Sequence, residues 1–144
     1  MTPVATDDPR QVFDRVPFMR LLGLQREHSA GGRARLVLPP HADLGNVIGA
    51  VHGGALATLL DVAMASAAVS ARDFVQTAVT LALHTQFIAP GTGRLVAEAQ
   101  WLHSDGDVAH CRATVTDADG RLVAQGQGSF RYLPRPHGAT APAA

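Results

Sequence analysis

The sequence predicts an α+β fold in which one long helix packs on an antiparallel sheet. Residues 53–70 are rich in Ala and Leu, and the run is long enough to favour a helix over a strand. One pair of strand-like runs precedes this helix and four follow it, separated by Gly, Pro and Asp turns. Because one helix cannot cover both faces of such a sheet, the other face needs solvent or a second subunit, and we expect an oligomer.

The elements before the helix are short. Apolar residues recur at roughly helical spacing over 10–22, with Pro17 interrupting, which predicts a short and partly irregular helix. Runs 24–28 and 33–38 flank a Gly-Gly turn and predict a hairpin. A polar, Gly-containing loop over 41–52 then leads into the long helix.

The runs after the helix predict consecutive strands. Residues 75–88 alternate, so we expect one face to carry Val75, Thr77, Val79, Leu81, Leu83, Thr85 and Phe87. Runs 94–103, 108–116 and 122–132 follow after tight turns, which predicts an antiparallel meander. The domain is expected to span 10–133, with a disordered N-terminus over 1–9 and a flexible tail over 134–144.

The composition excludes several classes of function. The 12 basic and 12 acidic residues balance, which gives no reason to expect nucleic acid or an anionic membrane as partner. Every basic residue is Arg, so a mechanism based on lysine is excluded. Cys111 is the single cysteine, so no disulfide can form within the chain. The first ten residues lack the apolar run of a signal peptide, and we expect a cytoplasmic protein with no membrane span.

Asp61 is the only residue with a formal charge between His52 and Arg72. A lone carboxylate in an apolar helix is costly to bury. Asp61 is therefore a candidate general base or nucleophile for hydrolysis. A structural alternative, in which Asp61 caps or pairs inside the core with Arg72, has equal standing on this residue alone.

The sequence His52-Gly53-Gly54 opens the helix. The first amides of a helix lack internal partners and attract negative charge, so this turn could polarise a carbonyl and hold an oxyanion. A tight turn without function is the alternative. His52 could act as a base or tie down the loop, and Asn46 could hold a water or a carbonyl or only support a turn.

Small residues surround the carboxylate on its helical face. Gly54 and Thr58 share that face with Asp61 and leave room for a ligand, so both are candidate substrate-binding residues. No second His or carboxylate stands at metal-ligand spacing from His52, and no metal is expected.

The combination of these residues resembles the motif of the hotdog-fold acyl-CoA thioesterases. The resemblance is carried by Asn46, Gly49, His52, Gly53, Gly54, Leu56, Leu60, Asp61 and Ala63. It is nearest to the phenylacetate-pathway (PaaI-like) branch, which carries Asp rather than Glu in the helix. Residues 79–91 and 124–128 are also similar to this branch, and the likeness covers roughly 20–132.

The resemblance implies a long curved antiparallel sheet wrapped round the central helix. It also implies a homodimer with active sites at the subunit interface, paired into a dimer-of-dimers tetramer. The implied reaction converts an acyl-CoA or aryl-CoA into the free acid and CoA. No cofactor is implied, because CoA is part of the substrate.

The resemblance also assigns roles to the site residues. The Gly53 amide polarises the thioester carbonyl, while Asp61 of the other subunit activates water or attacks directly. Asn46 helps to hold the carbonyl or the water, Thr80 positions the water, and His52 supports the loop.

The chain departs from the family pattern in two places. His84 stands where an Asn is frequent, and no Lys is present for the phosphates of CoA. Arg72, Arg94, Arg131 and Arg135 are the candidates to replace it. A non-catalytic acyl-CoA-binding or regulatory hotdog domain is the main alternative function, and a dehydratase on the same fold is a third.

Overall fold

The computed structural model describes residues 11–136. A short 3-10 turn, η2 (Phe13–Arg15), leads into α1 (Pro17–Leu22), so Pro17 begins a helix where the sequence suggested an interruption. The remaining elements are β1 (Gln25–Ala30), β2 (Arg33–Leu38), η3 (Ala42–Leu44), α2 (Gly53–Ser70), β3 (Gln76–Phe87), β4 (Leu95–Asp105), β5 (Val108–Thr116) and β6 (Leu122–Pro134).

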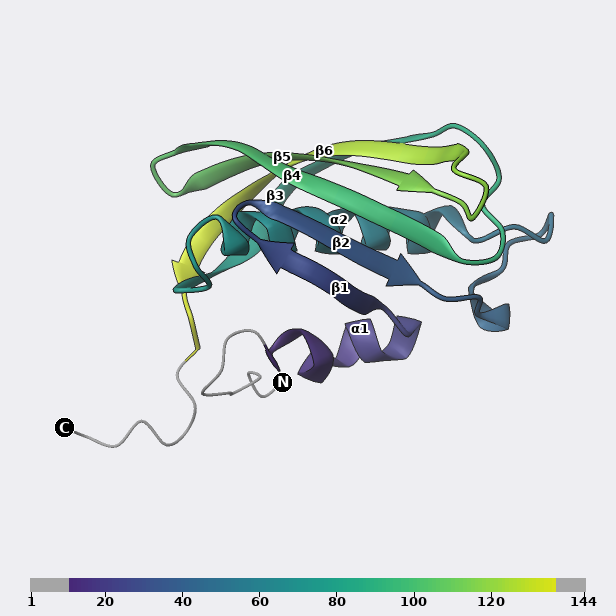
Figure 1. The fold of residues 1–144 in the computed structure, drawn as a ribbon, viewed down its shortest axis with the longest axis horizontal. Helices are drawn as coiled ribbons and strands as arrows, with labels where there is room; N and C mark the ends of the chain where they lie inside the picture. Colours follow the sequence, from purple (N-terminus) through teal and green to yellow (C-terminus); the bar gives the residue numbers. More distant parts are fainter. Residues whose placement is uncertain (1–10, 137–144) are drawn as a thin grey trace.

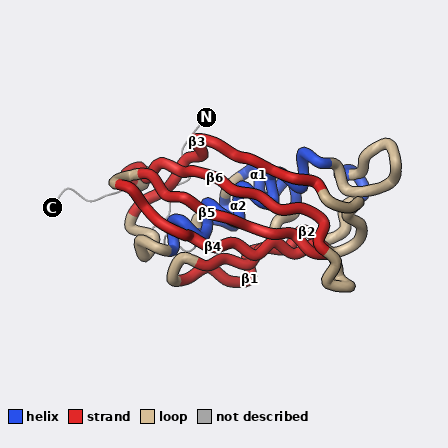
Figure 2. Tube along the Cα trace, turned by 90° about the horizontal axis from the view of Figure 1, so that it is seen from above, coloured by secondary structure: helices blue, strands red, loops and turns tan. Residues whose placement is uncertain are grey.

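The six strands form one antiparallel sheet in the order β1-β2-β4-β5-β6-β3. The sheet curves over α2, which runs along its inner face (Figure 1). Seen from above, β3, β6, β5 and β4 follow one another with α2 behind them (Figure 2). The predicted α+β layout of one long helix on an antiparallel sheet is therefore confirmed.

The central helix begins and ends where the sequence predicts. It is apolar on almost every side, and a helix of this kind is stable only when it is surrounded. Leu59, Leu60 and Met64 are fully buried against sheet residues such as Leu36 and Phe130. Within residues 11–136, α2 is the one helix long and apolar enough to cross a membrane, and it is the buried core helix of this domain.

The predicted meander is correct for three strands and wrong for the fourth. β4, β5 and β6 pair in sequence, but β3 pairs with β6 and lies at the edge of the sheet. The segment after β3 forms hydrogen bonds with β6 and with the loop before α2. Ile88 donates a backbone hydrogen bond to Val123, and Gly91 accepts one from Val51. The Pro90–Gly93 turn therefore carries the chain across the end of the sheet instead of closing a hairpin.

The predicted single face of β3 is also wrong, because a β-bulge interrupts the strand. Thr80 pairs with Phe130 and Ala82 with Ser129, so Leu81 is an extra residue. Residues opposite each other in a ladder share a face. Thr80 therefore lies on the helix-facing side with buried Phe130, while the odd-numbered residues reach that side only after the bulge.

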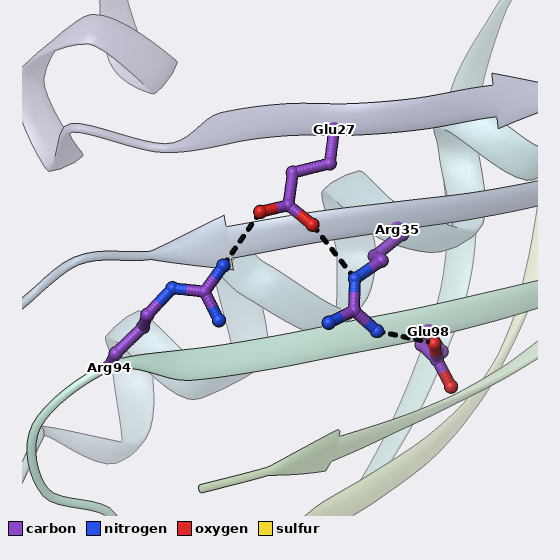
Figure 3. A network of polar contacts seen from close by, with 4 residues as sticks. All are labelled: Glu27, Arg35, Arg94 and Glu98. Atoms are coloured by element: carbon purple, nitrogen blue, oxygen red, sulfur yellow. Dashed lines mark hydrogen bonds and ion pairs between the residues drawn. The ribbon is translucent and has the colours of Figure 1, made fainter. Parts of the chain in front are cut away.

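The predicted hairpin is confirmed as β1 and β2, joined by Gly31 and Gly32 at φ of 58° and 81°. An exposed ion-pair network connects it to β4 (Figure 3). In this network Glu27 pairs with Arg35 at 2.8 Å and with Arg94 at 2.6 Å, and Arg35 also pairs with Glu98 at 2.7 Å. The expectation for residues 1–9 lies outside the described residues. β6 runs one residue into the expected tail, of which 137–144 also lie outside the described part.

Candidate active site

The pairing of β3 with β6 places Thr80 on the helix-facing side of the sheet, against Asp61. The Thr80 hydroxyl donates a hydrogen bond of 2.6 Å to Asp61 Oδ1. Asp61 lies midway along α2, and its side chain is partly buried between the helix and the strand. The structural alternative of an Asp61–Arg72 pair is not formed, because Arg72 bonds to Gln76 Oε1 and to the carbonyl of Gly106.

The surroundings of Asp61 favour a basic carboxylate. Burial raises its pKa above the ordinary value, and the Thr80 hydrogen bond opposes that rise. A carboxylate with a raised pKa accepts a proton more readily at neutral pH, which is the property that a general base needs. The pair therefore has the chemistry to orient and deprotonate a water molecule.

The Gly53 amide is the second potential element of the site. His52 caps the helix, since its Nδ1 accepts a hydrogen bond of 2.9 Å from the Gly54 amide. The His52 carbonyl accepts hydrogen bonds from the amides of Ala55 and Leu56. Within the described chain the Gly53 N–H is left without a hydrogen-bond partner. A free amide at a helix N-terminus can bind a carbonyl oxygen or an oxyanion.

Asn46 shapes the loop that leads to this amide. Its Oδ1 accepts hydrogen bonds from the amides of Ile48 at 3.1 Å and Ala50 at 2.9 Å. The side-chain NH₂ group is the part of Asn46 that could donate to a ligand. Asn46 and Gly53 line one shallow hollow together with the Phe87 ring.

The remaining candidates lie on another side of the helix N-terminus. His52, Gly54 and Thr58 line a separate hollow beneath α1. Thr58 donates to the carbonyl of Gly54 at 2.8 Å, so its hydroxyl is already used within the helix. The structure thus brings Thr80 to Asp61 and Asn46 to Gly53, while His52, Gly54 and Thr58 line a different hollow from Asn46 and Gly53.

Within one chain the two potential halves of the site are far apart. Asp61 follows Gly53 by eight residues (61 − 53) in the same helix, a separation of about 12 Å along its axis. A carbonyl that contacts the Gly53 amide therefore cannot also be reached by a water held on Asp61 of the same chain.

The edge strand β3 offers a surface for a second chain. Its outer backbone edge is unpaired in the described structure, and Val79, Leu81 and Leu83 are between 37% and 50% exposed. The unpaired backbone groups of a long apolar edge strand are a template for pairing with a strand of another chain. The sequence predicts an oligomer because one face of the sheet is uncovered. In the structure, the β3 edge is a further surface on which a second chain could pair.

Two features of this region were missed at the sequence level. The ring of Phe87 lies 3.5 Å from the position of a Cβ on Gly53, and Phe74 lines a cavity that also contacts Val62, the residue after Asp61. The bulge that fixes the position of Phe87 and the loop that places Phe74 have no clear signature in the alternation of β3. Within residues 11–136, no group of three or more His, Cys, Asp or Glu side chains is placed to hold a metal.

Comparisons with known proteins agree with this architecture. The family model of the thioesterase superfamily matches residues 48–124. An inferred esterase of Halobacterium salinarum is 33% identical over an alignment of 126 positions, and the alignment covers 80% of this chain and 83% of that protein.

Solved structures give the same result. A conserved protein of Pseudomonas aeruginosa is 35% identical, with a TM-score of 0.78 over 82% of this chain and 94% of that one. The PaaI protein from the phenylacetic acid degradation operon of E. coli superposes with a TM-score of 0.80 over 90% of this chain and 93% of that one. Its identity of 23% supports a common fold alone.

The chain belongs to the thioesterase superfamily, and its fold is the hotdog thioesterase fold. The family and the esterase relative together support a hydrolase of thioesters or esters. The central helix that carries Gly53 and Asp61 lies wholly inside the segment that matches the family model.

Proposed function

We propose that this protein hydrolyses acyl-CoA thioesters to a free acid and CoA. The observation that carries the proposal is the Asp61–Thr80 pair, a partly buried carboxylate hydrogen-bonded at 2.6 Å in the middle of the helix whose first amide is free. A pure binding module has no need of a costly carboxylate at this position. A thioester carbonyl is already electrophilic, so a positioned water, a base and an oxyanion site are sufficient for the reaction.

In the proposed site each active centre uses two subunits. The separation of about 12 Å between Gly53 and Asp61 along one helix argues against a site within a single chain. Antiparallel pairing of two β3 edges about a two-fold axis would bring the Gly53 end of one helix toward the middle of the other. The functional unit is then a homodimer, and a dimer of dimers is the extension that the sequence resemblance suggests.

The Gly53 amide of one subunit donates to the thioester oxygen as negative charge develops there. Asp61 of the other subunit, held by Thr80, either takes a proton from the attacking water or attacks the carbonyl itself. The NH₂ group of Asn46 assists in holding the carbonyl or the water, and His52 fixes the helix start by its cap. No metal or redox cofactor takes part in this scheme.

The arginines expected to bind the phosphates of CoA differ in their availability. Arg94 is engaged with Glu27 in the network of Figure 3, and Arg72 lies 3.8 Å above the Tyr132 ring while it bonds to Gly106. Arg131 is exposed on β6, which makes it more accessible to a phosphate than Arg72 or Arg94. An acyl-CoA or aryl-CoA substrate of the PaaI-like type and a cytoplasmic location complete the proposal.

Mixing two inactive subunits tests both the reaction and the shared site. Asp61→Asn and Gly53→Pro subunits are co-expressed with different tags, and the mixed dimer is purified and assayed with a panel of acyl-CoAs by thiol release. A shared site predicts that the mixed dimer regains about half of the wild-type activity, because one of its two sites is intact. No regain in the mixed dimer would contradict the shared site.

Assays of the wild-type protein distinguish the hydrolase from the binding domain and from the dehydratase. Binding of acyl-CoAs without release of CoA would support the non-catalytic alternative and overturn the hydrolase. Hydration of an enoyl-CoA without thioester cleavage would support the dehydratase.

A further inference from the structure

A partly open, mainly apolar cavity of about 290 Å³ lies beside α2 from Val62 onward, and we refer to it as the distal cavity. Its lining comes from the N-terminal segment, Arg26 of β1, the second half of α2, the first residues of β3 and the residues that follow β6. Its apolar walls are built by Val12, Phe13, Val16, Met19, Val62, Ala65, Val69, Phe74 and Ala78. A cavity of this size is at the lower end of the range for small-molecule sites.

Residues next to the Asp61–Thr80 pair along α2 and β3 line the distal cavity. Val62 is the next residue of α2 and Ala65 is one turn further along the same face as Asp61. On the strand, Ala78 precedes Thr80 by two residues and lies on the same side of β3 before the bulge. A thioester carbon next to Asp61 would therefore direct its acyl chain into this cavity.

The lining indicates a neutral, apolar occupant. Most of the wall is aliphatic or aromatic, and Ala65 and Ala78 leave the entrance open. Arg26 and Arg135 are the charged side chains of the lining. The Arg26 guanidinium lies 5.2 Å from the Phe13 ring centre and 5.6 Å from that of Phe74. Because the cation is stacked on two rings, its charge is directed at aromatic faces.

Phe74 stands at the far end of the cavity, in an unusual backbone conformation. It has a φ of 60° and follows Asp73, which has a φ of 51°. Two consecutive non-glycine residues in this region are strained and persist only where the surroundings hold them. The Phe74 amide bonds to the carbonyl of Val69 at 3.0 Å, and the residue is 7% exposed. Val69 is eight residues beyond Asp61 (69 − 61), or about 12 Å along the helix.

We propose that the distal cavity holds the acyl group of the thioester and that Phe74 is its end wall, which sets the longest acyl chain accepted. The substrate class is then a neutral straight-chain or aryl acyl group of short to medium length. This inference rests on the proposed thioesterase function and adds to it the place and the limit of acyl recognition.

The length limit is tested with a series of straight-chain acyl-CoAs and one aryl-CoA. The measured quantity is the ratio of kcat/KM for a long chain to that for a short chain. Phe74→Ala opens the end wall, so this ratio is expected to rise about tenfold or more. Phe74→Leu keeps most of the bulk and should move the ratio less. Ala65→Leu narrows the entrance and should lower the ratio by about tenfold.

The control truncates an apolar side chain outside the cavity. Leu102→Ala on β4 removes a residue that is 47% exposed, and its ratio should equal that of the wild type. An unchanged ratio in both Phe74→Ala and Ala65→Leu would overturn the proposal. If Phe74→Ala fails to fold, Phe74→Leu and Ala65→Leu decide the question by the same ratio.

Binding of the free carboxylic acids by calorimetry separates this inference from the proposed function. If no CoA thioester is cleaved but the acids bind with a length limit that Phe74→Ala extends, the distal cavity is an acyl site and the hydrolase proposal fails. If thioesters are cleaved and neither the cleavage ratio nor acid binding responds to the variants, the hydrolase stands and the cavity assignment is wrong.

Discussion

Thr80 donates a hydrogen bond of 2.6 Å to the Asp61 carboxylate across the space between β3 and α2. Thr80 is the last residue of β3 before the bulge at Leu81, and it lies on the same helix-facing side as Ala78. The hydrogen bond offsets part of the free-energy cost of burying the Asp61 carboxylate. It also moderates the basicity of the carboxylate, since the hydrogen bond lowers a pKa that burial raises.

The first prediction concerns this hydrogen bond and the pH profile. Thr80→Val removes the donor and leaves the burial of Asp61 in place, so the pKa of Asp61 should rise further. The acidic limb of kcat/KM, where the base becomes protonated, should then move to higher pH. Thr80→Ser keeps a hydroxyl and should leave the limb near its wild-type position. Identical acidic limbs in the Val and Ser variants would show that Thr80 does not act on the base.

The second prediction is that Asp61→Asn removes activity without harming the fold. Loss of a general base lowers kcat by about 10²- to 10⁴-fold, and steady-state kinetics would measure it. The amide keeps an oxygen that can accept the Thr80 hydrogen bond, and it removes a partly buried charge. Wild-type kcat in this variant would exclude Asp61 as base or nucleophile.

The same variant changes the dependence of stability on pH. The pKa of Asp61 is raised in the folded chain above its ordinary value of 3.8. Its favourable contribution is therefore fully present below that value and is lost as pH rises through the folded-state pKa. The wild type should lose stability relative to Asp61→Asn over this interval, as measured by Tm at a series of pH values. A constant difference in Tm across the interval would contradict the raised pKa.

The sequence predicts the central helix and its chemistry well because those signals are local. The apolar run of α2 has no break, and His52, Gly53 and Gly54 mark its start by capping chemistry alone. Asp61 stands out because a single charge in such a run is rare. These features need no knowledge of which strand lies beside which.

The order of the strands and the faces of β3 depend on long-range pairing. In the sequence, the Pro90–Gly93 turn resembles the connection of a hairpin. In the structure, backbone hydrogen bonds join Ile88 to Val123 and Gly91 to Val51, and β3 does not pair with β4. A one-residue bulge reverses every later side chain of a strand, and nothing in the alternation through Leu81 signals it. The distal cavity also depends on which elements pack together in the folded chain, and the sequence does not give this. Asp73 and Phe74 have positive φ, but neither is a glycine, so the sequence contains no signal for this turn.

The third prediction uses the Gly53 amide. Gly53 is the first helical residue, a position that accepts proline, and His52 before it has the extended conformation that a following proline requires. Gly53→Pro therefore removes the free N–H and keeps the helix, so kcat should fall by about 10²- to 10³-fold, as for the loss of an oxyanion donor.

Gly53→Ala is the control for this variant. Its added methyl group would lie 3.5 Å from the Phe87 ring, an ordinary contact, and the amide is retained. The Ala variant should keep most of the activity that the Pro variant loses, with equal helix content by circular dichroism. An equal loss in both variants would mean that crowding near Phe87, and not the donor, explains the effect.

The fourth prediction concerns the unpaired edge of β3. A lysine on an apolar edge strand opposes pairing with a second strand, so Leu81→Lys should convert a β3-paired dimer into a monomer. The matched control is Leu102→Lys, because Leu102 is 47% exposed, close to the 50% of Leu81, and lies on a strand that is already paired on both sides. Sedimentation velocity measures both variants. If Gly53 and Asp61 of different subunits form one site, the Leu81→Lys monomer loses activity together with the dimer, whereas a monomer with full activity would place the whole site within one chain.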